Sequence, residues 1–309
     1  MKNIIIILIV LVLAGAGVYF FIQSGLNEVL VNESLDETEI TTDIGRPQDD
    51  GQPDETQDGE EERKVESIIG KSVENRDIIA YHYGEGDTKL LFVGGIHGGY
   101  SWNTVLVAYE MMDYLEENPS VIPDNIEVTV IPSLNPDGQN KIVGTAGRFT
   151  KADVPAPDLR VPGRFNANNV DLNRNFDCDW QSTGTWRDTA VDGGSRAFSE
   201  PETMAIRDYV KAYNPDAVVV WYSAFGGVFA SNCHNGVLPE TLTITNVYAD
   251  ASGYPALKEF DFYEITGDMV NWLARNNIPG ISVLLTTHED VEWNKNRAGI
   301  EALLQYYAE

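Results

Sequence analysis

Short apolar runs alternate with amphipathic helical segments along most of this 309-residue chain, and this alternation constrains its fold more than any other feature. The runs have the length and composition of buried strands, and they end at glycine, proline or polar residues. We expect strands at residues 89–95, 126–132, 217–221 and 281–285, and helices at residues 104–116, 199–213 and 266–276. Strands that alternate with helices predict an α/β layer structure with a largely parallel central sheet.

Polar residues follow several of the predicted strands. His97, the turn at residues 135–138, Tyr222 and Thr286 each come shortly after one of them. In open α/β sheets, ligands bind at the carboxyl ends of the strands. These residues could therefore meet at one rim of the sheet.

An unbroken apolar run, residues 4–22, follows Lys2 at the N-terminus. It is long enough to cross a hydrocarbon core and exceeds the apolar stretch of most cleaved signal sequences. Residues 1–23 are therefore predicted to be a transmembrane anchor, with a long cleaved signal sequence as the alternative. Lysine before the run and acidic residues after it predict a single-pass protein of the cell membrane, with a cytoplasmic N-terminus and an extracytoplasmic C-terminal domain.

Residues 24–64 are rich in Asp, Glu, Thr and Gly and poor in aromatic residues. Such a segment cannot bury enough apolar surface to offset its chain entropy, so it is predicted to be an acidic disordered linker before a domain at residues 65–309. The formal net charge of the chain is −27. Nucleic acids and anionic lipids bind basic surfaces, so neither is expected as a partner, and the membrane is contacted through the N-terminal helix.

The two cysteines, Cys178 and Cys233, fall in the domain that is expected to be exported. Disulfides persist outside the cytoplasm. A bridge between these two residues is one interpretation, and a pair of free buried thiols is the other.

Residues 163–176 form a very polar run, with Arg164 near its start and the pair Asn173-Arg174 near its end. Arginine presents a rigid fork of donors that matches a carboxylate, and asparagine adds a neutral donor. The run could hold a carboxylate and a polarised carbonyl group, or it could be a polar surface loop.

Five motifs occur in an order and at spacings that resemble the zinc carboxypeptidases of the A/B type. They are Gly94-Gly95-Ile96-His97-Gly98-Gly99, Asn135-Pro136-Asp137-Gly138, Gly163-Arg164 with Asn173-Arg174-Asn175-Phe176, Ser199-Glu200-Pro201-Glu202, and Tyr263-Glu264-Ile265-Thr266-Gly267-Asp268-Met269. The resemblance extends from Val65 to Glu309. It implies a three-layer α/β/α sandwich with a twisted, mixed, largely parallel central sheet, here preceded by one transmembrane helix.

The resemblance also implies roles for individual residues. Asn173 and Arg174 would bind the terminal carboxylate of a peptide, and Arg164 would polarise its scissile carbonyl group. Tyr263 would close over the bound peptide. Val270, seven residues later, would line the base of the side-chain pocket and favour an apolar C-terminal residue.

The chain departs from this resemblance at the metal centre. His97 matches the first zinc ligand, but the acidic second ligand is replaced by Tyr100, or by Ser101 if this branch carries one extra residue. Tyr222 stands where the later histidine ligand is expected, and Leu284 stands where the general-base glutamate is expected. Zinc needs three or four N, S or carboxylate O ligands, a phenol is a poor substitute, and leucine cannot take a proton.

The chain is therefore predicted to be a non-catalytic pseudoenzyme that needs no cofactor and binds peptides or proteins with a free C-terminal carboxylate. The alternative is an active zinc carboxypeptidase for exported or cell-wall peptides, with zinc held by other residues. His82, His234 and His288 are the other histidines, each more typical of a surface or hydrogen-bonded role, and only His288 is expected near the rim. A third interpretation is a structural envelope domain whose pocket has lost its function.

Overall fold

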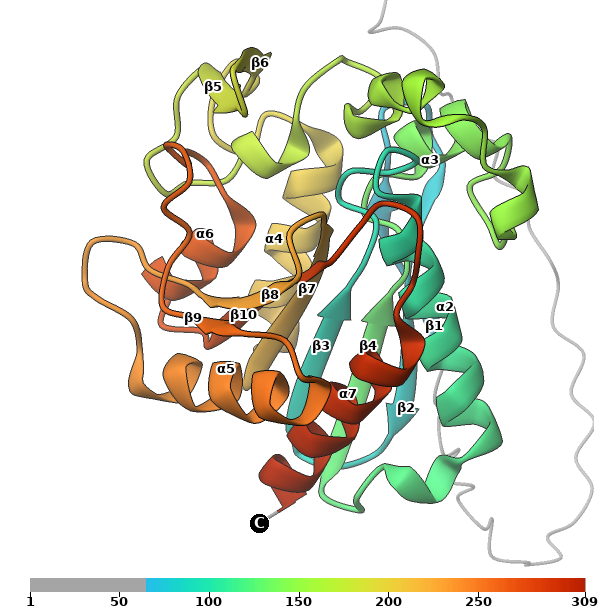
Figure 1. Ribbon diagram of the computed structural model, residues 1–309, viewed down its shortest axis with the longest axis vertical. Coiled ribbons are helices and arrows are strands. Elements are labelled where there is room, and N and C mark those ends of the chain that lie inside the picture. The colour runs from blue at the N-terminus through green and yellow to red at the C-terminus, as the bar shows by residue number, and fades with distance from the viewer. Residues whose placement is uncertain (1–64, 309) are drawn as a thin grey trace, which may run out of the picture. The chain divides into compact units, whose positions relative to one another are not determined.

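A mixed sheet of eight strands forms the centre of the computed structural model, which describes residues 65–308 (Figure 1). The strand order is β1-β2-β4-β3-β7-β10-β8-β9. The central strands β4, β3, β7 and β10 are parallel, whereas β2 and β8 pair with them in antiparallel fashion. The bounds are β1 Glu66–Lys71, β2 Asp77–Gly84, β3 Thr88–Val93, β4 Ile126–Ile131, β7 Ala217–Ser223, β8 Gly227–Ala230, β9 Ala256–Leu257 and β10 Gly280–Leu285, with a separate hairpin of β5 Thr183–Trp186 and β6 Thr189–Asp192.

Side chains of the central strands alternate between two hydrophobic cores. In β7, Val219 and Trp221 belong to one core, and Val218 and Val220 belong to the other. All four are at most 2% exposed. Successive side chains of a strand point to opposite faces, and a parallel sheet is covered on both. This double burial explains why the run has no polar residue at alternate positions.

Helices cover both faces of the sheet and complete the α/β/α sandwich (Figure 1). Helices α2, α5 and α7 contribute to one core, and α4 and α6 contribute to the other. Their bounds are α2 Trp102–Glu117, α3 Pro136–Val143, α4 Pro201–Tyr213, α5 Pro239–Ser252, α6 Met269–Arg275 and α7 Trp293–Ala308, with 3₁₀ turns η1 Pro119–Val121, η2 Lys151–Asp153, η3 Pro157–Leu159, η4 Val161–Arg164 and η5 Leu172–Arg174.

Every strand and helix expected from the sequence is present, with ends that differ by at most three residues. The sequence patterns did not predict β1, β2, β8 and β9, nor α3, α5 and α7. The outer strands are short or only partly buried, so their apolar pattern is weak. The α/β prediction with a parallel centre therefore agrees with the structure, and the edges of the sheet come from the structure alone.

The predicted transmembrane helix in front of the domain requires a correction. Between residues 65 and 308, no helix combines the length and apolar character needed to cross a bilayer. The longest, α2 and α7, have 16 residues each, which is a rise of about 24 Å against a hydrocarbon core of about 30 Å. The predicted anchor at 1–23 and the predicted linker at 24–64 lie outside the described residues. The fold class that the structure supports is the α/β/α sandwich alone.

Candidate ligand-binding site

A cavity of about 650 Å³ opens beside Tyr222 and Leu284, at the carboxyl ends of β7 and β10. Ser101 does not line it: the side chain is 1% exposed at the start of α2, and its hydroxyl has no partner in the described part of the chain. Of the two positions considered for the missing acidic ligand, Tyr100 is thus the one at the cavity. The predicted site residues that line the cavity are His97, Tyr100, Arg164, Asn173, Arg174, Tyr222, Tyr263, Val270 and Leu284.

His97 lies in the tight turn that follows β3. Gly98 has a φ of 42°, and a Cβ there would come within 2.7 Å of the Gly163 carbonyl oxygen, so glycine is required. The imidazole is 5% exposed; its Nε2 lies 3.4 Å from Asp171 Oδ1, and its Nδ1 has no hydrogen-bond partner among the described residues. Burial, assisted by the charge of Arg164, lowers the pKa of His97 to about 4, so the ring is neutral at pH 7.

Arg164 is paired with an internal carboxylate. Its Nε and Nη2 donate to Asp171 Oδ2 at 2.9 and 2.7 Å, and both side chains are buried. Burial alone would raise the pKa of Asp171, but the charge of Arg164 and the contact with His97 outweigh it and hold this pKa well below its usual range. Sequence reasoning missed Asp171, although an acidic residue among the arginines of the polar run was a visible signal.

Arg174 differs from Arg164 because its hydrogen bonds go only to main-chain carbonyl groups. Its Nε and Nη2 donate to Thr185 O at 3.2 and 2.8 Å, and its Nη1 donates to Asn173 O at 2.6 Å. The residue is 1% exposed, and within residues 65–308 it forms no ion pair. These bonds use three of the five guanidinium N–H donors. The other two donors of Arg174 have no hydrogen-bond partner among residues 65–308.

Asn173 is oriented by three neighbours. Its Oδ1 accepts hydrogen bonds from the Tyr222 hydroxyl at 3.2 Å and from the Met269 amide at 3.1 Å. Its Nδ2 donates to Asp268 Oδ2 at 2.8 Å. Burial raises the pKa of Tyr222 well above its usual range, so the phenol keeps its proton and acts as the donor. Asp268 was not a predicted site residue, although it stands in the last of the five motifs; in the structure it is the N-cap of α6.

The donors at the expected metal centre do not fit a zinc ion. Protein zinc sites use three or four N, S or carboxylate O ligands. The unpartnered Nδ1 of His97 is one suitable donor. Tyr100 and Tyr222 offer only phenols, and Leu284 offers no donor at all. Within residues 65–308, no group of three or more His, Cys, Asp or Glu side chains could hold a metal ion.

Two of the other histidines contact side-chain oxygen atoms of neighbouring residues. His82 on β2 lies with Nε2 2.9 Å from Ser67 Oγ and Nδ1 3.0 Å from Thr129 Oγ1. His234 is 70% exposed and its Nε2 lies 2.7 Å from Asp179 Oδ1. His234 lines the cavity, whereas His82 does not.

His288, the only one of these three histidines that was expected near the rim, does not line the cavity itself but contacts two residues that do. Its Nδ1 lies 2.9 Å from Ser223 Oγ, and its ring lies against that of Tyr100, with centroids 4.6 Å apart. Its Nε2 is buried without a partner among the described residues. Burial lowers the pKa of His288 to about 4. The ring is therefore neutral at pH 7.

Apolar and aromatic side chains form another part of the cavity lining. Val270 is 4% exposed and lines the cavity. Tyr263 packs edge-on against Phe260, with centroids 4.9 Å apart, and Phe260 contacts Phe229 at 5.6 Å. Phe262, at the same wall, is 53% exposed. This wall could contact an apolar side chain of a ligand.

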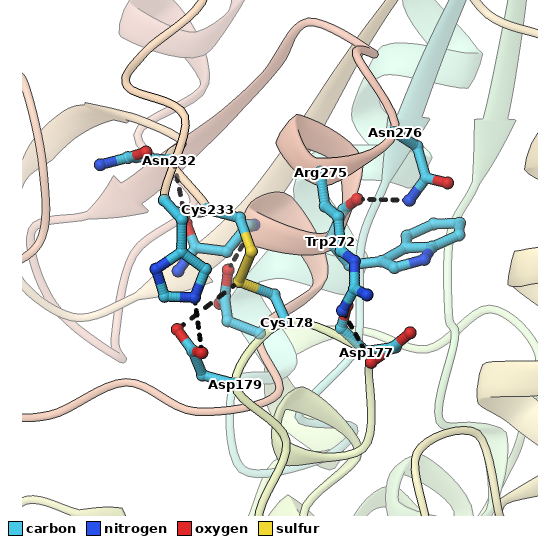
Figure 2. Close-up of a disulfide and its surroundings, with 11 residues drawn as sticks. Asp177, Cys178, Asp179, Asn232, Cys233, Trp272, Arg275 and Asn276 are labelled. Atoms are coloured by element: carbon cyan, nitrogen blue, oxygen red, sulfur yellow. Dashed lines mark hydrogen bonds and ion pairs between the residues drawn. A yellow bond between two sulfur atoms is a disulfide. The ribbon is translucent and has the colours of Figure 1, made fainter.

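A disulfide joins Cys178 to Cys233 (Figure 2), and Cys233 lines the cavity. It joins the loop just after Arg174 to the loop just after β8. Next to it, Asp179 and His234 form an ion pair that links the same two loops. Of the two interpretations of these cysteines, the structure shows the bridge, and it holds the polar run against the wall of the cavity.

Comparison with known families agrees with this geometry. Residues 57–229 match the family model described as zinc carboxypeptidase. This match covers more than half of the chain, so the chain belongs to the zinc carboxypeptidase family. It includes the positions of His97, Arg164, Arg174 and Tyr222 but ends before Tyr263 and the residues that follow.

Curated relatives cover part of the chain. A zinc carboxypeptidase of Simulium vittatum is 29% identical over 155 residues, which are 48% of this chain and 49% of that protein. A metallocarboxypeptidase A of Arthroderma otae is 30% identical over 177 residues, 52% of this chain and 40% of that protein. The aligned region thus spans half or less of the length of these relatives.

Solved structures share the fold. A carboxypeptidase A from Helicoverpa armigera superimposes with a TM-score of 0.61 at 20% identity, over 79% of this chain and 66% of that one. A murein-tripeptide amidase from Escherichia coli O157 superimposes with a TM-score of 0.56 at 19% identity, over 79% of this chain and 92% of that one. At these identities the likeness concerns the fold and not the chemistry.

Proposed function

We propose that this carboxypeptidase-like domain binds the free C-terminal carboxylate of a peptide and does not hydrolyse it. Arg174 carries the proposal. A buried guanidinium group without an ionic partner among the described residues is costly unless an anion binds it. Arg174 lines a cavity large enough for a peptide end.

The absence of hydrolysis is proposed from the donor set. The residues at the expected ligand positions are His97, Tyr100 and Tyr222, and the residue at the general-base position is Leu284. A neutral phenol whose pKa is raised does not replace a carboxylate or an imidazole as a ligand. Arg164 is engaged by Asp171 and is less available to a scissile carbonyl group.

The apolar side chains in the cavity lining indicate which class of ligand would bind. Val270 and the neighbouring aromatic side chains favour an apolar C-terminal residue over a charged one. The disulfide supports a site of action outside the reducing cytoplasm.

Calorimetry with the full chain tests the binding. The probe is acetyl-Ala-Ala-Leu, as the free acid and as the C-terminal amide. The acid should bind about 10- to 100-fold more tightly, the ratio expected for a charge-assisted hydrogen-bond pair. Arg174→Ala should remove that preference. Equal binding of acid and amide, or no binding of either, would exclude the proposal.

Measurements of metal content and of peptide hydrolysis test the proposed absence of catalysis. The purified chain should carry much less than one equivalent of zinc and should release no leucine from the acid probe. One equivalent of zinc together with leucine release would instead establish an active metallocarboxypeptidase. As a constructive control, the triple variant Tyr100→Glu, Tyr222→His and Leu284→Glu should gain zinc.

A further inference from the structure

The carboxylate of Asp268 already lies where the proposed ligand would bind. Asp268 lines the cavity, is 7% exposed, and belongs to the turn before α6. Its Oδ2 accepts the hydrogen bond of Asn173 Nδ2 at 2.8 Å, and its Oδ1 accepts that of the Asn271 amide at 3.0 Å. We refer to Asn173 and Arg174 together as the carboxylate cradle. One of its donors is therefore engaged by the protein itself.

The surroundings of Asp268 leave its charge poorly compensated. Burial raises the pKa of Asp268. The hydrogen bonds from Asn271 and Asn173 and the charge of Arg174 lower this pKa, but by less than burial raises it. The charged or titratable groups that act on it are Arg174 from η5 and Tyr222 from β7. Tyr222 stays neutral, so Arg174 supplies the only positive charge among them.

A second carboxylate in the cradle would compete with Asp268 for the same donors. Two adjacent carboxylates repel each other, and this repulsion raises the pKa of one of them, which favours the uptake of one proton by the pair. We propose, on the basis of the proposed function, that Asp268 gates the cradle: a peptide carboxylate binds together with one proton, which Asp268 takes from solvent. The O–H of Asp268 then donates to the bound carboxylate, Oδ1 keeps its bond to Asn271, and Asn173 Nδ2 is released to the ligand.

The proposed proton uptake predicts that the affinity for the peptide carboxylate falls as the pH rises. Ligand binding adds a negative charge beside Asp268 and so raises its pKa further in the complex. Affinity is constant below the pKa of the free protein. It falls by up to about tenfold per pH unit as the pH rises toward the pKa of the complex, because one proton must be taken up.

Calorimetry in two buffers of different ionisation enthalpy, phosphate and Tris, measures this proton directly. With the full chain and the free-acid probe acetyl-Ala-Ala-Leu, binding to the natural protein should take up close to one proton. Asp268→Asn should take up none, should bind the probe more tightly at pH 7, and should lose the pH dependence. Asparagine is also a good N-cap, so α6 is preserved.

Two further variants make the result unambiguous. Asp268→Ser keeps a capping hydroxyl but is too short to reach Asn173, and it should behave like Asp268→Asn. Glu264→Gln removes one charge from the same segment, where no hydrogen bond joins it to Asn173, and it should keep the proton uptake. Preferential binding of the acid without proton uptake, or unchanged affinity in both Asp268 variants, would overturn the gate alone. Equal binding of acid and amide would overturn the proposed function instead.

Discussion

Tyr222 links the expected metal centre to the carboxylate cradle. A histidine at the end of β7 could present a nitrogen to a metal ion. The tyrosine instead donates its hydroxyl hydrogen to Asn173 Oδ1, because burial keeps the phenol protonated. Tyr222 therefore orients the side-chain amide of Asn173, which belongs to the proposed cradle.

Tyr222→Phe should weaken binding of the free-acid probe about fivefold, because one neutral hydrogen bond is worth about 1 kcal/mol. Calorimetry on the full chain measures the change. Tyr83→Phe is the matched control, since its hydroxyl bonds to Glu116 away from the cavity, and it should leave affinity unchanged. Equal affinities for both variants would show that Tyr222 does not orient the cradle.

At the scale of elements, Arg164 is positioned by the packing of η4 against α3. The N-cap Asn135 accepts a hydrogen bond from Gly138 N and donates to Arg164 O at 3.3 Å. Gly163 allows the contact, because a Cβ there would lie 2.2 Å from Ile142 Cγ1. The close approach of these two elements fixes the position of the Arg164 main chain, from which the side chain extends.

Gly163→Ala should therefore lower the free energy of unfolding by about 1–3 kcal/mol, the usual effect of overpacking. Urea titration followed by circular dichroism measures it. In the same region Gly147→Ala is a suitable control, because a Cβ there meets nothing closer than Thr145 Oγ1 at 3.6 Å. A Gly163→Ala protein as stable as the control would contradict this account of the turn.

At the scale of the whole domain, the two cores and the disulfide hold distant segments together. The bridge connects residues separated by 55 positions, which lie on two loops of the cavity (Figure 2). Closing such a long loop removes much of the entropy of the unfolded chain. The polar run depends on this closure because it has little regular structure of its own.

Replacing both cysteines by serine should lower the free energy of unfolding by about 2–4 kcal/mol. The thermal midpoint of the natural protein should fall with dithiothreitol present, while that of the double variant should not respond to it. An equal response in both proteins, or none in either, would show that the bridge does not stabilise the fold.

Buried neutral histidines make the domain sensitive to acid. His97 and His288 have pKa values lowered to about 4 by burial, whereas unfolded histidine titrates near 6.5. Between these values the unfolded chain binds more protons, so stability decreases as the pH falls. The free energy of unfolding should drop by up to about 2 kcal/mol per histidine between pH 6.5 and 5.

Urea titrations across this pH range check the prediction. His97→Gln and His288→Gln should each flatten the profile. The exposed histidine variant His234→Gln should keep it. A profile that stays steep in both buried variants would assign the acid sensitivity to other groups.

The sequence by itself determined the elements whose pattern is local. The apolar run of β7 and the alternation of strands with helices predicted the α/β fold, because each signal lies within about ten residues and reflects burial on both faces. The ordered motifs identified Arg164, Asn173 and Arg174 as one group. The same resemblance predicted that Tyr222 and Leu284 stand where a zinc ligand and the general base are expected.

Only the tertiary structure decided how these groups are paired. Asp268 reaches Asn173 across 95 positions of the chain, and Ser223 reaches His288 across 65. No local pattern encodes such contacts, because they depend on where the sheet and its loops bring distant side chains. The structure thus separated Arg164, whose charge Asp171 compensates, from Arg174, which forms no ion pair within residues 65–308.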